Sequence, residues 1–249
     1  MNNLIRSEFS KLNKDRSFRF IVIMLLVIAV LAPIFFDDVS SFEGNEFYRT
    51  FILLGNYQIV IYLPLILAGF FIANEYQAGT MKIFAASGNS RMNIYLSKLL
   101  VYGFGSIVIM TILPVVMILS SCIIHGFSMF PDIEFFLQTL ALNGLYTAAF
   151  AAFAMIAATL LNDSGKAIGV LLLFFALADQ ILGVIDGVIP WLNPVIQNSI
   201  FVKYNELPFI DQLEQFGGSE IMRFIVYPLG SIIVLSVIGG MIFSRKEIK

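Results

Sequence analysis

Six apolar segments, each long enough to cross a lipid bilayer, follow one another along this chain. An α-helix needs about 20 mostly apolar residues to cross the hydrocarbon core. Of the 249 residues, 59% are hydrophobic and only 13% are charged, which is outside the range of soluble domains. Because backbone polar groups must find their partners inside each segment in lipid, these segments are expected to be helices. We predict one all-α, polytopic membrane domain over residues 1–249 with six transmembrane helices at 18–36, 51–73, 99–124, 135–161, 167–189 and 224–243.

The lysines and arginines between these spans predict the orientation of the chain. Of the 15 Lys and Arg residues, only Arg49, Lys203 and Arg223 fall on one side of the membrane. The side that is richer in Lys and Arg is normally the cytoplasmic one. Both termini are therefore expected in the cytoplasm, which agrees with an even number of spans.

Two segments outside the spans are also apolar in part. In residues 1–17, Ile5, Phe9 and Leu12 share one helical face and Lys11 lies away from it, which predicts an amphipathic interfacial helix along the inner leaflet. The alternative is a frayed tail ahead of the first span. The connection 190–223 has an apolar first half, and this favours an extracellular re-entrant or interfacial segment.

The connection between the second and third spans, residues 74–98, is too apolar for a short cytoplasmic loop. Met81, Ile83 and Phe84 fall within one turn of a predicted short helix. The charged residues around these three are Glu75, Lys82 and Arg91. Exposed apolar side chains with a charged rim are typical of a protein docking surface. We therefore predict that this loop binds a cytoplasmic partner.

Sequence motifs for catalysis are missing. No G-x-x-x-x-G-K-[ST] phosphate loop occurs, and Ser164-Gly165-Lys166 lacks the preceding glycine. One cysteine and one histidine provide no Cys/His cluster for a metal. We expect that the chain is not an enzyme and binds neither cofactor nor metal, and that nucleic acid is not among its partners.

Asp179 is a carboxylate near the middle of the fifth predicted span. Such a group costs at least ~2.5 kcal/mol in a bilayer, so it is expected to face protein or water. Two interpretations stay open: a polar point on a substrate path or a protonatable group, and an interhelical hydrogen bond with Asn143 or Tyr146 of the fourth span. Gln180 and Asp186 are the neighbouring candidates for a path, although interfacial exposure is favoured for Asp186 near the outer end.

The chain resembles an ABC-2 type permease, the membrane subunit of an ATP-binding-cassette exporter. The resemblance covers the N-terminal amphipathic helix, the six spans and the loop after the second span. That loop is similar to the family pattern E-x3-G-T-x-K followed by R and K, which falls on Glu75, Gly79, Thr80, Lys82, Arg91 and Lys98. In length and N-terminal style, the small permeases of lantibiotic immunity, bacitracin resistance and amphipathic-peptide export are most similar.

The resemblance implies that residues 74–98 carry a cytoplasmic coupling helix that docks on an ATPase. The apolar trio Met81, Ile83 and Phe84 would pack into a groove of that ATPase, with charged residues pairing at its rim. Gly79 would permit a turn, and Asn89 or Ser90 would cap the next helix. The residues that the resemblance assigns to ATPase coupling are Glu75, Gly79, Thr80, Met81, Lys82, Ile83, Phe84, Arg91 and Lys98. The alternative for Arg91 and Lys98 is simple anchoring at the positive-inside face.

The resemblance further implies partners, cargo and location. The partners are two cytoplasmic ABC ATPase subunits, which bind ATP and Mg, a second permease copy (identical or related), and the lipid bilayer. The cargo is a hydrophobic or amphipathic compound, such as a peptide or antimicrobial, exported across a bacterial plasma membrane. Two other classes fit the residues: an ion-coupled secondary carrier or channel, and a non-transporting membrane scaffold for a cytoplasmic partner.

Overall fold

The computed structural model describes residues 2–35, 42–80, 88–209 and 218–246. The regular secondary structure of these residues is helical, with no strand. Six of the described helices are long and apolar enough to cross a membrane, one for each predicted span. They are Arg16–Phe35, Gly44–Gln77, Arg91–His125, Ile133–Leu161, Ser164–Val188 and Met222–Arg245. The prediction of an all-α protein with six spans is confirmed.

The second and third spans are longer than predicted, at 34 and 35 residues. At 1.5 Å per residue each is about 50 Å long, which exceeds a hydrocarbon core of about 30 Å. Both contain π-helical turns. The second span consists of α3 (Gly44–Phe47), η2 (Tyr48–Leu53), η3 (Asn56–Val60), α4 (Tyr62–Ala68), η4 (Gly69–Ala73) and α5 (Asn74–Gln77). The third consists of α7 (Arg91–Ile112), η5 (Leu113–Met117) and α8 (Ile118–His125).

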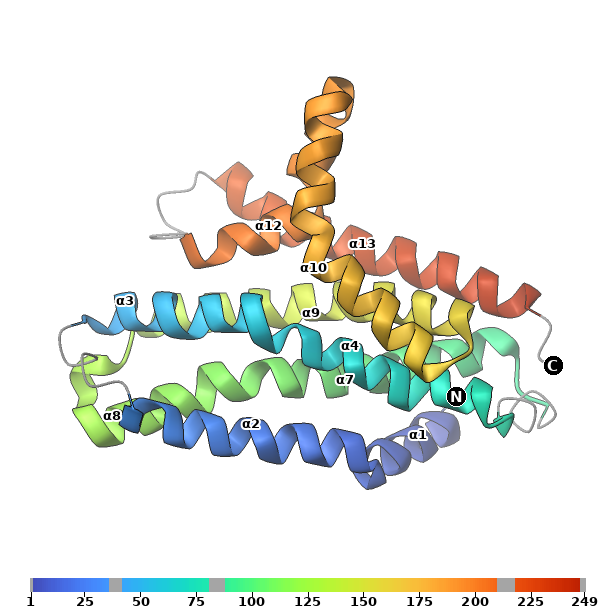
Figure 1. The fold of residues 1–249 in the computed structure, drawn as a ribbon, viewed down its shortest axis with the longest axis horizontal. Helices are drawn as coiled ribbons and strands as arrows, with labels where there is room; N and C mark the ends of the chain where they lie inside the picture. Colours follow the sequence, from blue (N-terminus) through green and yellow to red (C-terminus); the bar gives the residue numbers. More distant parts are fainter. Residues whose placement is uncertain (1, 36–41, 81–87, 210–217, 247–249) are drawn as a thin grey trace.

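Most of the spans lie along the long axis of the molecule, which gives the bundle two distinct ends (Figure 1). At one end lie α1 (Asn2–Lys14), α5, and the last turn of α13 (Gly218–Arg245). We call this the basic end, because the lysines and arginines that were predicted to be cytoplasmic lie here as far as the structure describes them. At the other end, the acidic end, lie α3, α8 and the turn η6 (Phe127–Met129).

The central helix is α9 (Ile133–Leu161), which packs against α7 and α13. Its Ala149, Ala152, Ala154 and Ala158 are completely buried. Small side chains of this kind allow helices to approach closely in lipid, where dispersion forces drive their association. Close approach continues on α13, where a Cβ at Gly239 would lie 1.9 Å from the hydroxyl oxygen of Tyr95.

Pro33 in α2 (Arg16–Phe35) leaves one backbone carbonyl without its helical partner. A proline has no N–H, so the carbonyl of the residue four positions earlier, Ala29, loses its hydrogen bond. The hydroxyl of Ser120 in α8 donates a hydrogen bond to that carbonyl over 2.8 Å. The neighbouring helix thus supplies the bond that α2 cannot make.

Pro114 in η5 has the same effect on the carbonyl of Met110 in α7. The side-chain amides of Asn56 and Asn143 both donate to this oxygen, over 2.8 and 3.1 Å respectively. Asn143 in turn accepts a hydrogen bond of 2.8 Å from the hydroxyl of Tyr204. The missing backbone bond is therefore the centre of a polar network that joins the second, third and fourth spans.

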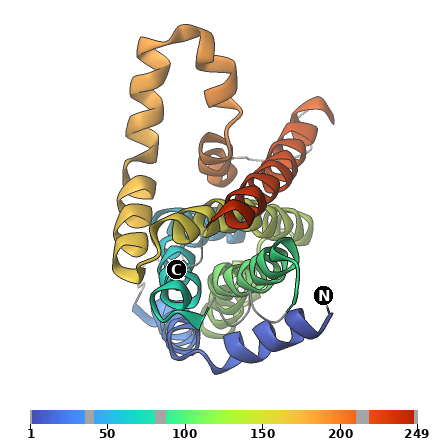
Figure 2. The ribbon, with the colours of Figure 1, turned by 90° about the vertical axis from the view of Figure 1, so that its right-hand side faces the viewer.

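The fifth span, α10 (Ser164–Val188), begins beside η4 at the basic end and then projects away from the bundle at about half of its length (Figures 1 and 2). The chain returns through four short helices. They are η7 (Pro190–Leu192), α11 (Asn193–Gln197), α12 (Ile200–Glu206) and η8 (Leu207–Phe209). Tyr204 and Leu207 are buried against the bundle. The predicted re-entrant segment thus contains short helices that fold back onto the protein, and its position in the bilayer stays a prediction.

Candidate functional site

Four charged side chains form a cluster at the basic end, between α1, α5 and α7. The ammonium of Lys98 donates to the carboxylate of Glu8 over 2.8 Å and also bonds to Glu75. Lys11 pairs with Glu75, and with Glu8 over 3.3 Å. The side chains of Glu8 and Lys98 are only 1% exposed. We call these four residues the ionic cluster, and their charges cancel.

The ionic cluster depends on all three helices. An unpaired charge in a buried position is strongly unfavourable, whereas mutual pairing offsets much of that cost. Burial works against the charged form of Lys11, but the carboxylates of Glu75 and Glu8 outweigh burial and raise the pKa of Lys11 above its usual value. The arrangement therefore holds α1 firmly against the junction of the second and third spans.

The two residues after Glu75 contact the remaining helices at this end. The ring of Tyr76 lies 4.6 Å below the ammonium of Lys246, which follows α13. The side-chain oxygen of Gln77 accepts a hydrogen bond of 3.3 Å from the hydroxyl of Ser164, the first residue of α10. Three consecutive residues of α5 thus reach α1, α7, α10 and the end of α13.

Two basic side chains bond to the ends of other helices here. Arg91, at the start of α7, donates to the backbone oxygens of Ser244 and Lys246 over 3.0 and 2.7 Å. Lys246 donates to the Thr159 carbonyl and the Asn162 side chain at the end of α9, and burial lowers the pKa of Lys246. Cations at helix C-termini satisfy free carbonyls and complement the helix dipole. These contacts hold α7, α9 and α13 together.

The backbone on both sides of the predicted coupling helix has defined turns. Gly79 has a φ of +70°, a conformation that L residues with a Cβ rarely adopt, and its N–H donates to the Tyr76 carbonyl over 3.1 Å. The hydroxyl of Thr80 donates to the Glu75 carbonyl over 3.1 Å. On the far side, the Ser90 hydroxyl accepts from the backbone N–H of Asn93 over 3.3 Å and caps α7. The turn expected at Gly79 is present, and Ser90 is the capping residue of the two candidates.

Not every predicted coupling residue is where the sequence interpretation placed it. Met81, Lys82, Ile83 and Phe84 lie outside the described residues. Glu75 was expected at the rim of a docking surface, but it is 8% exposed and belongs to the ionic cluster. Lys98 belongs to the ionic cluster, and Arg91 bonds to backbone oxygens at the end of α13. The partners that α1 supplies were missed, although the Glu8–Lys11 spacing on an amphipathic helix was a signal for them.

Asp179 makes an interhelical hydrogen bond, but with a different partner from those expected. The hydroxyl of Tyr57 in η3 donates to its carboxylate, and Asn143 is instead bonded to Tyr204. The expectation of Asn143 or Tyr146 as the partner is therefore wrong. Hydropathy does not specify how the second and fifth spans are rotated about their own axes. That rotation brings Tyr57 of the second span to Asp179 of the fifth.

The other two candidates for a substrate path lie away from Asp179's contacts. Gln180 is exposed on α10. The carboxylate of Asp186 accepts a hydrogen bond of 2.8 Å from the side chain of Asn193, across the turn that leads into α11. Asp186 thus stabilises the outer turn, and the structure does not bring the three residues together.

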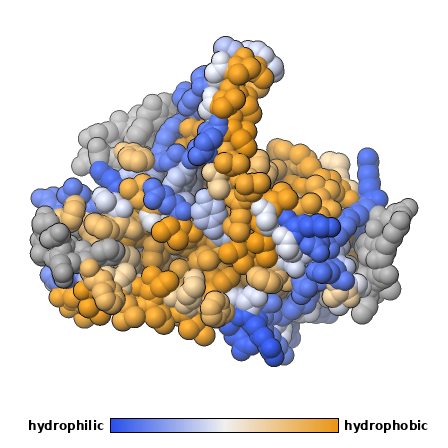
Figure 3. All heavy atoms as spheres, in the orientation of Figure 1, coloured by the Kyte–Doolittle hydropathy of each residue, from blue (hydrophilic) through white to orange (hydrophobic). Residues whose placement is uncertain are grey.

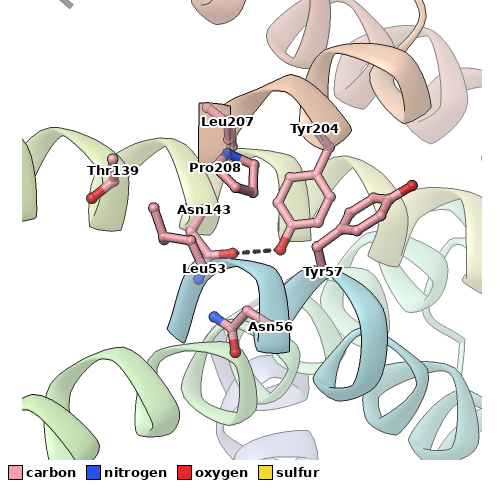
Figure 4. Close-up of a pocket in the computed structure, with 8 residues that line it drawn as sticks. All are labelled: Leu53, Asn56, Tyr57, Thr139, Asn143, Tyr204, Leu207 and Pro208. Atoms are coloured by element: carbon pink, nitrogen blue, oxygen red, sulfur yellow. Dashed lines mark hydrogen bonds between the residues drawn. The ribbon is translucent and has the colours of Figure 1, made fainter. Parts of the chain in front are cut away.

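Tyr57, Tyr204 and Asn143 all line one small pocket inside the bundle (Figure 4). Tyr57 and Tyr204 lie side by side there, with ring centroids 5.7 Å apart. The hydroxyl of Tyr204 points to Asn143, whereas that of Tyr57 points the opposite way (Figure 4). The tyrosine pair therefore divides the polar network inside the bundle from the surface that contains Asp179.

A protein-family model described as ABC-2 family transporter protein matches residues 4–178 of the chain. The matched part includes the ionic cluster, the Gly79 turn and the first four spans. It ends immediately before Asp179. A comparison with curated proteins gives no match.

Proposed function

Since the chain belongs to the ABC-2 family of transporter proteins, we propose that it is the permease subunit of an exporter whose energy comes from a separate ABC ATPase. In this proposal residues 74–98 dock on the ATPase, and ATP and Mg are bound there and not by this chain. The basic end faces the cytoplasm of a bacterial cell. The cargo is a hydrophobic or amphipathic compound such as an antimicrobial peptide.

The contacts of α5 carry this proposal. α5 forms the start of residues 74–98, and its Glu75, Tyr76 and Gln77 contact Lys98, Lys246 and Ser164 in or beside the neighbouring helices. A displacement of the docking segment would therefore pull on α1, α7, α10 and α13 at the same time. Because Glu8, Glu75 and Lys98 of the ionic cluster are buried, separating these charges would be unfavourable, and the helices would move as a connected group.

A second permease copy would complete the transport path. Three spans, α2, α10 and α13, have few buried residues within the single chain. In the most apolar 18-residue stretch of each, 22%, 11% and 17% of the residues are buried, respectively. Many of their exposed side chains are apolar, and hydrophobic residues form a band along the face of the bundle that Figure 3 shows. We propose that lipid and a second copy, identical or related, share these faces.

The docking proposal is tested with the ATPase subunit encoded by a neighbouring reading frame, recognised by a phosphate loop and an ABC signature. Phe84→Asp is expected to abolish co-purification of that ATPase and to remove the effect of the permease on its rate of ATP hydrolysis. Phe127→Asp is the matched control, since Phe127 is 85% exposed at the acidic end. Unchanged co-purification and hydrolysis in Phe84→Asp would contradict the proposal.

A further inference from the structure

A groove opens on the surface of the bundle where α10 departs from it. It has a volume of about 140 Å³ and is bordered by η3, α4, α9, α10 and α12. The residues that line it are Tyr57, Gln58, Ile61, Tyr62, Phe150, Phe175, Ala176, Ala178, Asp179 and Phe201. In Figure 3, hydrophilic residues interrupt the hydrophobic surface at the foot of the projecting part of α10.

One charge faces this groove, and it is negative. Asp179 is exposed, and the hydroxyl of Tyr57, which donates a hydrogen bond to its carboxylate, supplies no positive charge. Within the described residues, no lysine or arginine lines the groove or forms an ion pair with Asp179. A carboxylate on a membrane-spanning helix requires water or a cation nearby.

Aromatic rings line the groove together with the carboxylate. Phe150, Phe175 and Phe201 come from α9, α10 and α12, and their ring centroids lie 5.2 to 5.4 Å apart. Rings arranged in this way attract a cation that approaches a ring face and also contact apolar groups around the charge. An anion would meet the carboxylate and the ring faces, which both repel it.

We propose that this groove binds the positively charged part of a lipophilic cation, with Asp179 as the counter-ion and the three phenylalanines as the apolar contact. The inference rests on the proposed function, since it names the charge class of the cargo. It narrows a hydrophobic or amphipathic cargo to one with a permanent or protonated cationic group next to rings or alkyl chains. Tyr57 holds the carboxylate toward the groove and is a positioning residue.

The test uses two ions of nearly equal size and opposite charge. Binding of tetraphenylphosphonium and of tetraphenylborate to the purified full-length chain in nanodiscs is measured by titration calorimetry, with empty nanodiscs subtracted to remove partitioning into lipid. Asp179→Asn is expected to weaken tetraphenylphosphonium binding about tenfold or more, and not to weaken tetraphenylborate binding. Asp186→Asn, whose carboxylate bonds to Asn193 outside the groove, is the control and leaves both ions unaffected.

A second pair of variants covers the case in which Asp179→Asn fails to fold. Phe175→Leu is expected to weaken tetraphenylphosphonium binding several-fold, whereas Phe104→Leu, an exposed ring on α7 outside the groove lining, leaves it unchanged. Equal tetraphenylphosphonium binding in the wild type, Asp179→Asn and Phe175→Leu would overturn the inference, as would a parallel loss of both ions. Neither result affects the proposed ATPase docking, because the ATPase is absent from the titration and co-purification tests it separately.

Discussion

The ammonium of Lys98 lies 2.8 Å from the carboxylate of Glu8, and both side chains are 1% exposed. The two residues are 90 positions apart in the chain. One belongs to α1 and the other to the third span. This pair fixes α1 to the bundle at the point where the proposed docking segment begins.

Replacing Lys98 is expected to destabilise the protein strongly. Lys98→Met leaves Glu8 buried and without its nearest cation, and breaking a buried pair from one side costs about 3–5 kcal/mol. Lys203→Met is the matched control, because Lys203 pairs with a Glu206 that is 41% exposed and should cost less than about 1 kcal/mol. Thermal unfolding in detergent measures both, and equal shifts for the two variants would show that the ionic cluster contributes no special stability.

The bond from Ser120 to the Ala29 carbonyl should matter only while Pro33 is present. Ser120→Ala leaves that carbonyl unpaired and is expected to cost about 1–2 kcal/mol. In a Pro33→Ala background the new N–H can bond to Ala29, so the same change should cost almost nothing. A double-mutant cycle from thermal unfolding checks this. Ser121→Ala is the control, since its hydroxyl bonds only to the Met117 carbonyl of its own helix; additive effects would refute the account.

Gly239 and Gly230 on α13 should respond in opposite ways to alanine. A Cβ at Gly239 would lie 1.9 Å from the Tyr95 hydroxyl oxygen, so Gly239→Ala is expected to separate α13 from α7 and to cost about 1–3 kcal/mol. At Gly230 nothing lies within 4 Å of the added Cβ, and alanine should stabilise the helix by up to about 1 kcal/mol. Melting temperatures of the two variants decide; a tolerated Gly239→Ala would mean that α13 packs differently.

At Gly79 the backbone conformation, and not space, should limit substitution. Its φ is +70° and an added Cβ would meet nothing within 4 Å. Asparagine tolerates this conformation, whereas valine is strained by about 1–3 kcal/mol. Gly79→Asn should therefore keep the effect of the permease on ATP hydrolysis, and Gly79→Val should lose it while the melting temperature of the remaining bundle changes little. If both variants kept that effect, the turn at Gly79 would have no role in coupling.

The sequence was sufficient for the spans and for the local turns. Apolar length alone locates six helices, and the residue types at Gly79 and Ser90 indicate a turn and a cap because these effects act within a few residues. The lengths of the second and third spans were underestimated, because their helices continue into polar sequence beyond the hydrocarbon core.

Contacts between distant segments were beyond the sequence interpretation. Glu75 looked like a surface charge because its partners, Lys11 and Lys98, come from other helices. For Asp179 the interpretation gave the right kind of bond and the wrong helix, since helix rotation depends on packing that involves every neighbour. The groove beside Asp179 results from the departure of α10, and no periodicity in that apolar helix indicates where it leaves the bundle.

The ionic cluster also has a consequence for how the protein is made. Glu8 is synthesised long before Glu75 and Lys98, and its counter-ion at Lys98 belongs to the third span. Until the third span has been inserted, Lys98 is not available as the counter-ion of Glu8. α1 would therefore take up its buried position against the bundle only after that insertion. α1 would thus leave the ribosome before the second and third spans, and would reach its final place at the basic end only after them.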